Sequence, residues 1–405
     1  MRWHLVLAIA LVACKRTPAE PPPLPRDSEL AWQRVVLTGA DKTEVAFLTG
    51  LPRGSDDRAI VVTGTERVVG QVRHVGASLR VEFPIYLTAL VLDPGPDHGY
   101  QGRYEIASPA FGTGSMPLRA SPVAGPTLSA LATVADGPWL DLHEARTVWQ
   151  LMLGGLRVKL VLQQRGPGEL DGTVFFDNGH VTYLGGTGRG DHAVLGGFEG
   201  TSPSSLDLVF DAARGTVTGT WRAGQLLSWK EAVTGTRTAD FELQPKITLD
   251  GDRPVLRHPQ LRDFDGKPLI VELAATWCET CKLMVPVLRD IYGEHKGEGL
   301  AMVSLLYELT NDPNANREGE RRFRELDNVP WPVRAVPGEQ EDLGDIMPEG
   351  LNNVDVGGFP VVIFRRRDGT IAGVQSGFPA ASTGAAHDTV IARMRSLTSE
   401  ILRSP

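Results

Sequence analysis

The two cysteines of the motif Trp277-Cys278-Glu279-Thr280-Cys281 constrain the fold of this chain more than any other feature of its sequence. The apolar run Leu269–Ala274 comes directly before the motif, and apolar residues at helical spacing follow it as far as Ile291. This order predicts a strand that leads into a helix, with the motif at the junction. Apolar runs and helical patterns continue to alternate after Pro245, so we expect an α/β domain whose sheet is partly parallel.

The position of the cysteines at this junction also predicts their chemistry. Cys278 falls at the N-terminus of the helix, where free backbone amides and the helix dipole stabilise a thiolate. Cys281 lies one turn further along, close enough to close a small disulfide ring. We therefore expect an exposed, reactive Cys278 and a buried, resolving Cys281, a pair that supports dithiol–disulfide exchange.

Two other uses of a cysteine pair fit the sequence less well. Half of a zinc site would need further ligands at a matching spacing, but the chain has no second Cys-x-x-Cys and its nine histidines are scattered. A peroxiredoxin nucleophile needs the context Pro-x-x-x-Thr-x-x-Cys, whereas Val271 and Ala275 occupy the proline and threonine positions. We expect neither a metal nor another cofactor.

Beyond the cysteines, the C-terminal part resembles the thioredoxin superfamily at three places. Pro286, five residues after Cys281, matches the proline that kinks the active-site helix of that family. Glu272 stands where thioredoxins carry a buried acid. Gly358-Phe359-Pro360, before the apolar run 361–364, resembles the cis-proline loop of the family.

The resemblance implies roles for these residues. Cys278 and Cys281 would form the redox-active disulfide, and Glu272 would act with them as a third catalytic residue. A central strand covered on both faces would bury Glu272 and raise its pKa, so that it could accept the proton of Cys281. The alternative for Glu272 is a solvated strand residue.

The same resemblance implies a binding site for the client polypeptide. Phe359 and Pro360 would lie beside the active-site sulfurs, and the backbone of their loop would pair with the client as an added strand. The alternative for Pro360 is an ordinary trans proline in a loop. Trp277 would form a wall beside Cys278, with a role in proton transfer as the alternative. We expect the side chain of Lys282 to be solvated, with a contact to the thiolate as the alternative.

The spacing of these motifs narrows the resemblance. Pro360 follows Cys278 by 82 residues, an interval longer than in a minimal thioredoxin. An insertion of this kind together with a signal peptide resembles the TlpA-like branch of periplasmic thiol–disulfide reductases, over about residues 250–404. The chain departs from that pattern in the Glu-Thr between its cysteines, which lacks the common proline. Met284 stands where some of these reductases carry Glu, which leaves Glu272 as the only obvious buried acid.

The N-terminal residues predict export and a lipid anchor. A positively charged start and an apolar run at 5–12 describe a signal peptide, and Leu11-Val12-Ala13-Cys14 resembles the bacterial lipobox, whose cysteine is acylated. We expect a lipoprotein signal peptide at 1–13, lipidation of Cys14 and a Pro-rich tether at 14–29. The chain would then be anchored on the periplasmic side of the cell envelope. An ordinary cleaved signal with an incidental cysteine is the alternative.

Upstream of Pro245 the pattern is β. Short β-branched runs alternate with turn signals such as Asp177-Asn178-Gly179, which indicates a sandwich or a barrel. Pro-rich breaks near residues 122–126 divide this region in two. We therefore expect a β module at 30–122, a second at 127–245 and a thioredoxin-like domain with an insertion at 246–405. The β region loosely resembles N-terminal extensions of some TlpA-family lipoproteins, which brings no known chemistry with it.

The overall composition excludes several other classes of protein. A formal net charge of −8 argues against a nucleic-acid binder that relies on global basicity. Three cysteines are too few for a disulfide-dense scaffold. The interior of the sequence has no apolar stretch long enough for a polytopic membrane protein.

The sequence thus predicts a membrane-tethered periplasmic thiol–disulfide oxidoreductase that reduces disulfides of client proteins. A membrane electron donor would re-reduce it, and the direction of the reaction follows from the family resemblance. An oxidase or isomerase acting through the same cysteines is one alternative. The other is an envelope-binding lipoprotein whose β modules carry the function and whose redox domain is accessory.

Overall fold

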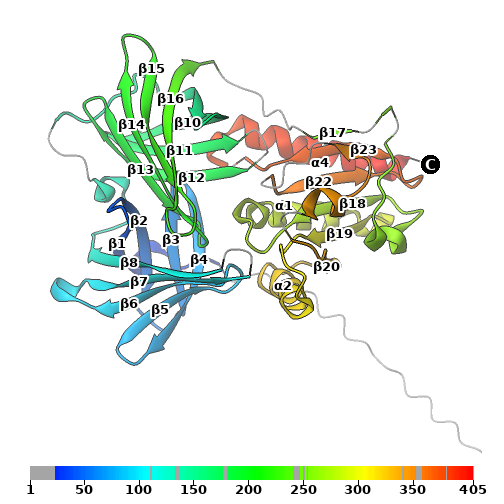
Figure 1. Cartoon of the computed structure of the whole chain (residues 1–405), viewed down its shortest axis with the longest axis horizontal. Coiled ribbons are helices and arrows are strands. Elements are labelled where there is room, and N and C mark those ends of the chain that lie inside the picture. The colour runs from blue at the N-terminus through cyan, green and yellow to red at the C-terminus, as the bar shows by residue number, and fades with distance from the viewer. Residues whose placement is uncertain are drawn as a thin grey trace, which may run out of the picture.

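The structure is a computed structural model that describes residues 23–109, 112–132, 137–176, 180–239, 247–249, 251–252, 254–339, 342–352, 358–379 and 381–404. The predicted signal peptide and Cys14 lie outside the described residues. Within these ranges no helix is both long and apolar enough to cross a membrane. Figure 1 shows two β-barrels and, beside them, a domain of helices around an open sheet.

Barrel 1 is a closed ring of eight antiparallel strands in sequence order. The ring closes because β1 pairs with β8, where Val35 lies opposite Ala120. Alternate residues point inward, as Val81 and Phe83 do in β5, and fill the interior. The strands are β1 Leu30–Thr38, β2 Glu44–Pro52, β3 Arg58–Thr63, β4 Glu66–Val75, β5 Ser78–Phe83, β6 Thr88–Pro94, β7 Tyr100–Ser108 and β8 Gly112–Pro122.

Barrel 2 repeats this design with the next eight strands. Here β9 pairs with β16, and Leu153 lies opposite Val233. The sequence was compatible with a sandwich or a barrel for each β module, and both modules are barrels. The strands are β9 Arg146–Leu153, β10 Leu156–Gly166, β11 Glu169–Phe176, β12 Val181–Arg189, β13 His192–Phe198, β14 Pro203–Asp211, β15 Thr216–Ala223 and β16 Trp229–Thr238.

The C-terminal domain has the expected α/β form with a partly parallel sheet. Its five strands lie in the order β20-β19-β18-β22-β23; β18 is parallel to β19 and antiparallel to β22. Helix α1 follows β18 and contacts α4, whereas α2 packs on β20. The elements are β18 Leu269–Ala274, α1 Glu279–His295, β19 Ala301–Leu306, α2 Pro313–Leu326, β20 Val333–Ala335, α3 Leu343–Ile346, β22 Val361–Arg365, β23 Ile371–Ser376 and α4 Ala385–Arg403.

Short elements connect these units. The two-residue strands β17 and β21 pair with each other away from the main sheet. They are Thr248–Leu249 and Leu351–Asn352, and the short 3-10 helices are η1 Asp27–Glu29, η2 Pro96–His98, η3 Leu128–Leu131, η4 Pro259–Phe264, η5 Lys296–Glu298 and η7 Ala381–Thr383.

The two barrels are joined by an aromatic side chain that passes from one into the other. Phe198, the last residue of β13 in barrel 2, lies among the core rings of barrel 1. Its ring centroid is 5.0 Å from that of Phe47 and 5.4 Å from those of Phe83 and Tyr104. Full burial of a Phe side chain contributes about 2 to 3 kcal/mol, so separating the barrels would be costly.

The backbone after Phe198 strengthens this junction. We call residues 198–202 the plug segment. The hydroxyl of Thr88 in barrel 1 donates to the carbonyl oxygen of Gly200, and the hydroxyl of Tyr104 donates to that of Thr201. Gly200 has φ +91°, and a Cβ there would lie 2.9 Å from the ring of Tyr86. Only glycine fits such a position. The insertion of Phe198 and the two hydrogen bonds to the plug segment hold the barrels together as one unit.

Candidate active site

The site begins at the junction that the sequence predicted. Cys278 and Cys281 form a disulfide at the start of α1. Cys278 is the N-cap residue of the helix, and its Sγ accepts a hydrogen bond from the backbone N–H of Cys281 at 3.1 Å. The backbone turns into the helix through a 3.2 Å hydrogen bond from Cys278 N to the carbonyl oxygen of Ala275. The sulfur of Cys278 therefore sits at the positive end of the helix dipole, where a thiolate is stabilised on reduction.

The expectation of an exposed Cys278 is wrong for this structure. Cys278 is 6 % exposed and Cys281 is fully buried. The local strand–helix pattern could not reveal this burial, because part of the cover over the start of α1 comes from the barrels, as the contacts below show.

An aromatic stack connects the cysteine motif to the loop before β22. The ring of Phe359 stacks on Tyr307 with 5.4 Å between centroids, and the ring of Trp277 lies 5.7 Å from Phe359. The indole N–H of Trp277 donates to the carbonyl oxygen of Tyr307 at 3.0 Å. The Phe359–Pro360 peptide bond is cis, and both residues are buried. The structure thus gathers Trp277, Phe359 and Pro360 around one end of the sheet.

Glu272 occupies the centre of the sheet, on β18. It is fully buried, and burial raises the pKa of its carboxyl group to about 7, although a hydrogen bond from Ser304 opposes part of that shift. The Ser304 hydroxyl donates to Oε2 at 2.5 Å, and the indole N–H of Trp331 donates to the same hydroxyl at 2.7 Å. Among the described residues, Oε1 has no hydrogen-bond partner. The polar contact of Glu272 is therefore with Ser304 and not with either cysteine.

Glu272 is not the only buried acid, which corrects a second expectation. Glu279, the residue after Cys278, is 8 % exposed, and Glu308 is 6 % exposed. Glu308 accepts hydrogen bonds from the backbone and the hydroxyl of Thr276, at 2.8 and 2.5 Å. Glu308 therefore helps to fix the turn that leads into the cysteine motif.

Glu279 forms a carboxyl pair with Glu199 of the plug segment. Burial, and then the negative charge of Glu279, raise the pKa of Glu199 well above its ordinary value. Glu199 therefore keeps its proton and donates a hydrogen bond to the carboxylate of Glu279. Burial also raises the pKa of Glu279, while the hydrogen bonds from Glu199 and Ser202 oppose the rise. The backbone N–H of Tyr183 donates to Glu199 at 2.8 Å, which orients the pair.

Lys282 is not solvated, contrary to expectation. Its side chain is 11 % exposed, its ammonium group donates to the carbonyl oxygen of Ala275 at 2.9 Å, and it lies 4.0 Å from the carboxylate of Asp327. The ring of Phe323 lies 4.4 Å from the same nitrogen. Burial lowers the pKa of Lys282, whereas Asp327 raises it. Packing of α2 and of barrel 1 against this side of α1 explains the burial.

Barrel 2 supplies the rest of the cover. The hydroxyl of Thr280 donates to the carbonyl oxygen of Val181, and the hydroxyl of Tyr183 donates to that of Phe378, each at 3.3 Å. The hydroxyl of Ser202 donates to Glu279, also at 3.3 Å. We call the surface formed by Val181, Tyr183, Glu199 and Ser202 the cap face.

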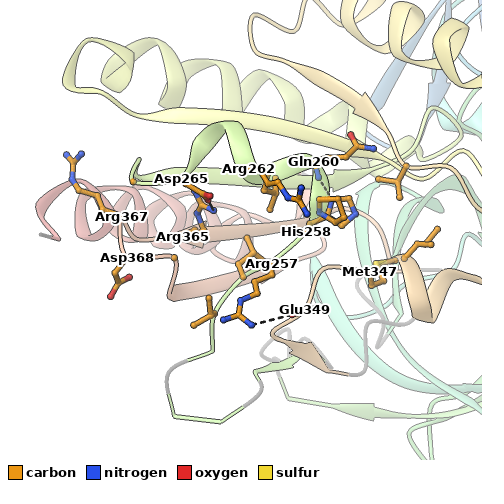
Figure 2. A pocket seen from close by; sticks show the side chains of 18 of the residues that line it. Arg257, His258, Gln260, Arg262, Asp265, Met347, Glu349, Arg365, Arg367 and Asp368 are labelled. Carbon is orange, nitrogen blue, oxygen red and sulfur yellow. Dashed lines mark hydrogen bonds and ion pairs between the residues drawn. The ribbon is translucent and has the colours of Figure 1, made fainter.

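Two cavities lie near this domain. A cavity of about 370 Å³ borders Glu279, Lys282 and the cap face. Another, of about 850 Å³, is lined by charged side chains such as Arg257 and Arg365 (Figure 2). Arg365 pairs with Leu269 at the start of β18, whereas Cys278 follows its end. The larger cavity is therefore remote from the disulfide. In the described part of the chain, no three His, Cys, Asp or Glu side chains gather as metal ligands.

Sequence reasoning missed the contribution of barrel 2. Glu199 stands in Gly196-Gly197-Phe198-Glu199-Gly200, an acid within a glycine-rich apolar segment. This acid in an apolar setting was the one signal in the sequence that barrel 2 contacts another part of the chain, because a buried carboxyl group requires a polar partner. The partner, Glu279, lies 80 residues away along the chain, so the pattern could not identify it.

Comparison with known proteins finds partial matches to proteins named thiol-disulfide oxidoreductase and thioredoxin. The chain is 34% identical over 71 residues to the thiol-disulfide oxidoreductase ResA of Oceanobacillus iheyensis, a match that covers 18% of this chain and 35% of the relative. It is 36% identical over 53 residues to a thioredoxin of Mycolicibacterium smegmatis, covering 13% and 46%. The chain thus spans about a third to a half of the length of these relatives. No family model matches it.

Solved structures show a similar partial match. A thiol:disulfide interchange protein of the thioredoxin family from Chlorobium tepidum TLS aligns over 38% of this chain and 99% of its own, with 16% identity and a TM-score of 0.26.

The raised pKa of Glu272 predicts a pH-dependent stability. Because its pKa is about 7 in the folded protein and ordinarily 4.5, its contribution is fully present below about pH 4.5 and is lost as the pH rises through 7. Replacing Glu272 with Gln removes this loss, worth about 3 kcal/mol. The opening free energy of β18 can be measured by native-state hydrogen exchange between pH 4.5 and 8. As the pH rises over this range, the opening free energy of Glu272→Gln should increase relative to that of the wild type, so that the two curves diverge.

Glu325→Gln is the matched control, because the Glu325 side chain is 53 % exposed and its partner, Arg321, stays charged across this pH range. Its curve should run parallel to that of the wild type. A Glu272→Gln curve that also ran parallel would contradict the assignment of a buried acid with a raised pKa.

Proposed function

We propose that this chain, whose C-terminal domain is a TlpA-like member of the thioredoxin superfamily, is an oxidoreductase that reduces disulfides of client proteins. The observation that carries the proposal is the Cys278–Cys281 disulfide at the start of α1, with Cys278 as the N-cap residue. Similarity to relatives named as thiol-disulfide oxidoreductases supports it. The strand order of the sheet and the position of α1 support a thioredoxin-like fold for residues 246–405, with an insertion that contains α2 and α3.

The proposed reaction consists of two thiol–disulfide exchanges. The Cys278 thiolate attacks one sulfur of a client disulfide, forming a mixed disulfide and releasing the other client sulfur as a thiolate. Cys281 then loses its proton and attacks Cys278, so that the client leaves as a dithiol. The client gains two electrons and two protons, and the enzyme is left with the Cys278–Cys281 disulfide. A membrane electron donor would supply two electrons to restore the dithiol.

Glu272 is the proposed acceptor of the Cys281 proton. A carboxyl group with a pKa of about 7 can accept and release a proton near neutral pH. Its free Oε1 leaves an acceptor position open, while Ser304 holds Oε2. The loop at Phe359 and Pro360, beside Trp277, is the proposed binding site for the client backbone.

The mechanism assigns different fates to the two cysteines. Cys281→Ala should retain the client on Cys278 as a stable mixed disulfide, because the second exchange cannot occur. Cys278→Ala is the matched control and should trap nothing, since it lacks the attacking thiolate. Non-reducing electrophoresis and mass spectrometry of the adducts would report both results.

Absence of any Cys281→Ala adduct, or equal trapping by the two variants, would count against this mechanism. The direction of the reaction has a separate readout in the equilibrium of the cysteine pair with glutathione. A reduction potential close to that of strong oxidases would replace reduction by oxidation or isomerisation and leave the exchange mechanism in place.

The proposed location is the periplasmic side of the cell envelope, with a lipid on Cys14 and residues 14–29 as a tether. The lipobox-like sequence at the end of an apolar run supports this proposal. The β-barrels dock on the redox domain, so covering the redox site is a further candidate role for residues 30–245, beside the envelope-binding role considered from the sequence.

Lipidation at Cys14 predicts the fractionation of the full chain. Cys14→Ser should move the protein from the membrane to the soluble fraction and abolish labelling by a radioactive fatty acid. Cys281→Ala also loses one cysteine and should stay in the membrane fraction with its label. Retention of Cys14→Ser in the membrane fraction would contradict the anchor.

A further inference from the structure

The part of the redox domain that would receive a client is buried in this structure. Gly358, Phe359 and Pro360 are all buried, and so are the neighbouring residues 377–379. Phe359 is 1 % exposed and Phe378 is 3 % exposed. A client strand that pairs with the backbone of this loop needs an open edge, so the loop as it stands cannot accept one.

The cap face lies against this same region. Tyr183 bonds to the carbonyl oxygen of Phe378, Thr280 bonds to the carbonyl oxygen of Val181, and Ser202 bonds to Glu279. An apolar contact accompanies these bonds, because Leu283 of α1 packs against a cluster in barrel 2. That cluster consists of Val148, Val161, Phe175, Val181 and Tyr183.

The contacts of the cap face are weaker than those that join the barrels. Three of its hydrogen bonds, those of Tyr183, Thr280 and Ser202, each measure 3.3 Å, beyond the usual range of about 2.7 to 3.2 Å for strong bonds. The fourth joins Glu199 to Glu279 and persists only while one of the two carboxyl groups keeps its proton. By contrast, Phe198 is fully buried inside barrel 1. The cap face should therefore separate from α1 more readily than Phe198 leaves barrel 1.

The carboxyl pair at the cap face adds to this weakness. Glu199 and Glu279 can share the interface only while at least one of them is protonated, because two buried carboxylates repel each other. The other charged and titratable groups around the pair are Glu66, Arg67, Tyr86, Tyr183, Lys282 and Asp327. Separation would return Glu199 and Glu279 to water, where both can ionise.

We propose that the cap face determines the substrate specificity of the exchange reaction. While it is docked, it blocks extended polypeptides from the Phe359–Pro360 loop, and only small disulfides reach Cys278 through its residual exposure of 6 %. Protein disulfides react after the two-barrel unit has separated from α1. This inference rests on the proposed function and names the residues that control access to its site.

Rates with two substrates test the inference on the full, reduced chain. The probes are 2-hydroxyethyl disulfide, a small molecule, and insulin, a protein disulfide. The double variant Tyr183→Phe/Ser202→Ala removes two cap-face hydrogen bonds without removing apolar side chains. The ratio of the insulin rate to the small-disulfide rate should rise on the order of tenfold, because two lost hydrogen bonds favour the open form by about that factor.

Tyr100→Phe/Ser78→Ala is the matched control. It also removes a tyrosine and a serine hydroxyl, but both residues belong to barrel 1, in β7 and β5, and neither lies in the plug segment or the cap face. The Ser78 hydroxyl donates to Asp93 within the same barrel. Its rate ratio should equal that of the wild type. The single variant Tyr183→Phe repeats the test with a smaller change, and circular dichroism checks that each variant is folded.

The outcomes separate the inference from the function on which it rests. An unchanged or lower ratio in the cap-face variants would overturn the inference, and a lower one would mean that the cap face binds the client. A wild-type chain that reduces neither substrate would overturn the proposed function itself. A wild-type chain that reduces both at comparable rates, with no response to the variants, would keep the function and reject the cap.

Discussion

The start of helix α1 is the constraint on which the rest of this structure depends. The first backbone amides of a helix have no partner within it, so this end favours a negative charge. The sequence places Cys278 there as the N-cap residue and Glu279 directly after it. One sulfur and one carboxyl group thus share the same favourable field, and the surrounding protein must accommodate both.

The barrels accommodate the carboxyl group. Glu199 of the plug segment keeps its proton and donates a hydrogen bond to Glu279, so that the docked pair avoids carrying two charges beside the sulfur of Cys278. The position of Glu199 follows from the insertion of Phe198 into barrel 1, because the two residues are adjacent. The packing of the β region and the electrostatics of the redox site are therefore linked through one short segment.

Local sequence patterns predicted the parts of the site that local structure determines. The strand–motif–helix order predicted β18 and α1 with the cysteines at their junction. The position of Glu272 in a central strand predicted its burial and its raised pKa. The burial of Cys278 and Lys282 and the pairing of Glu279 with Glu199 could not be predicted. These features arise from contacts between segments far apart in the chain, and a periodicity argument covers only one element at a time. Likewise, the alternation of apolar and polar residues predicts strands but does not show whether a sheet closes on itself. The sequence could therefore not distinguish a barrel from a sandwich.

The start of α1 makes Cys278 the nucleophile and leaves Cys281 protected. The most direct measurement is the rate of alkylation of the reduced full chain by iodoacetamide across pH, with mass spectrometry to identify the modified cysteine. We expect modification of Cys278 alone, with the pH midpoint of its alkylation rate below the value of about 8.5 for a free cysteine. Equal modification of both cysteines, or a Cys278 midpoint at or above that of free cysteine, would contradict it.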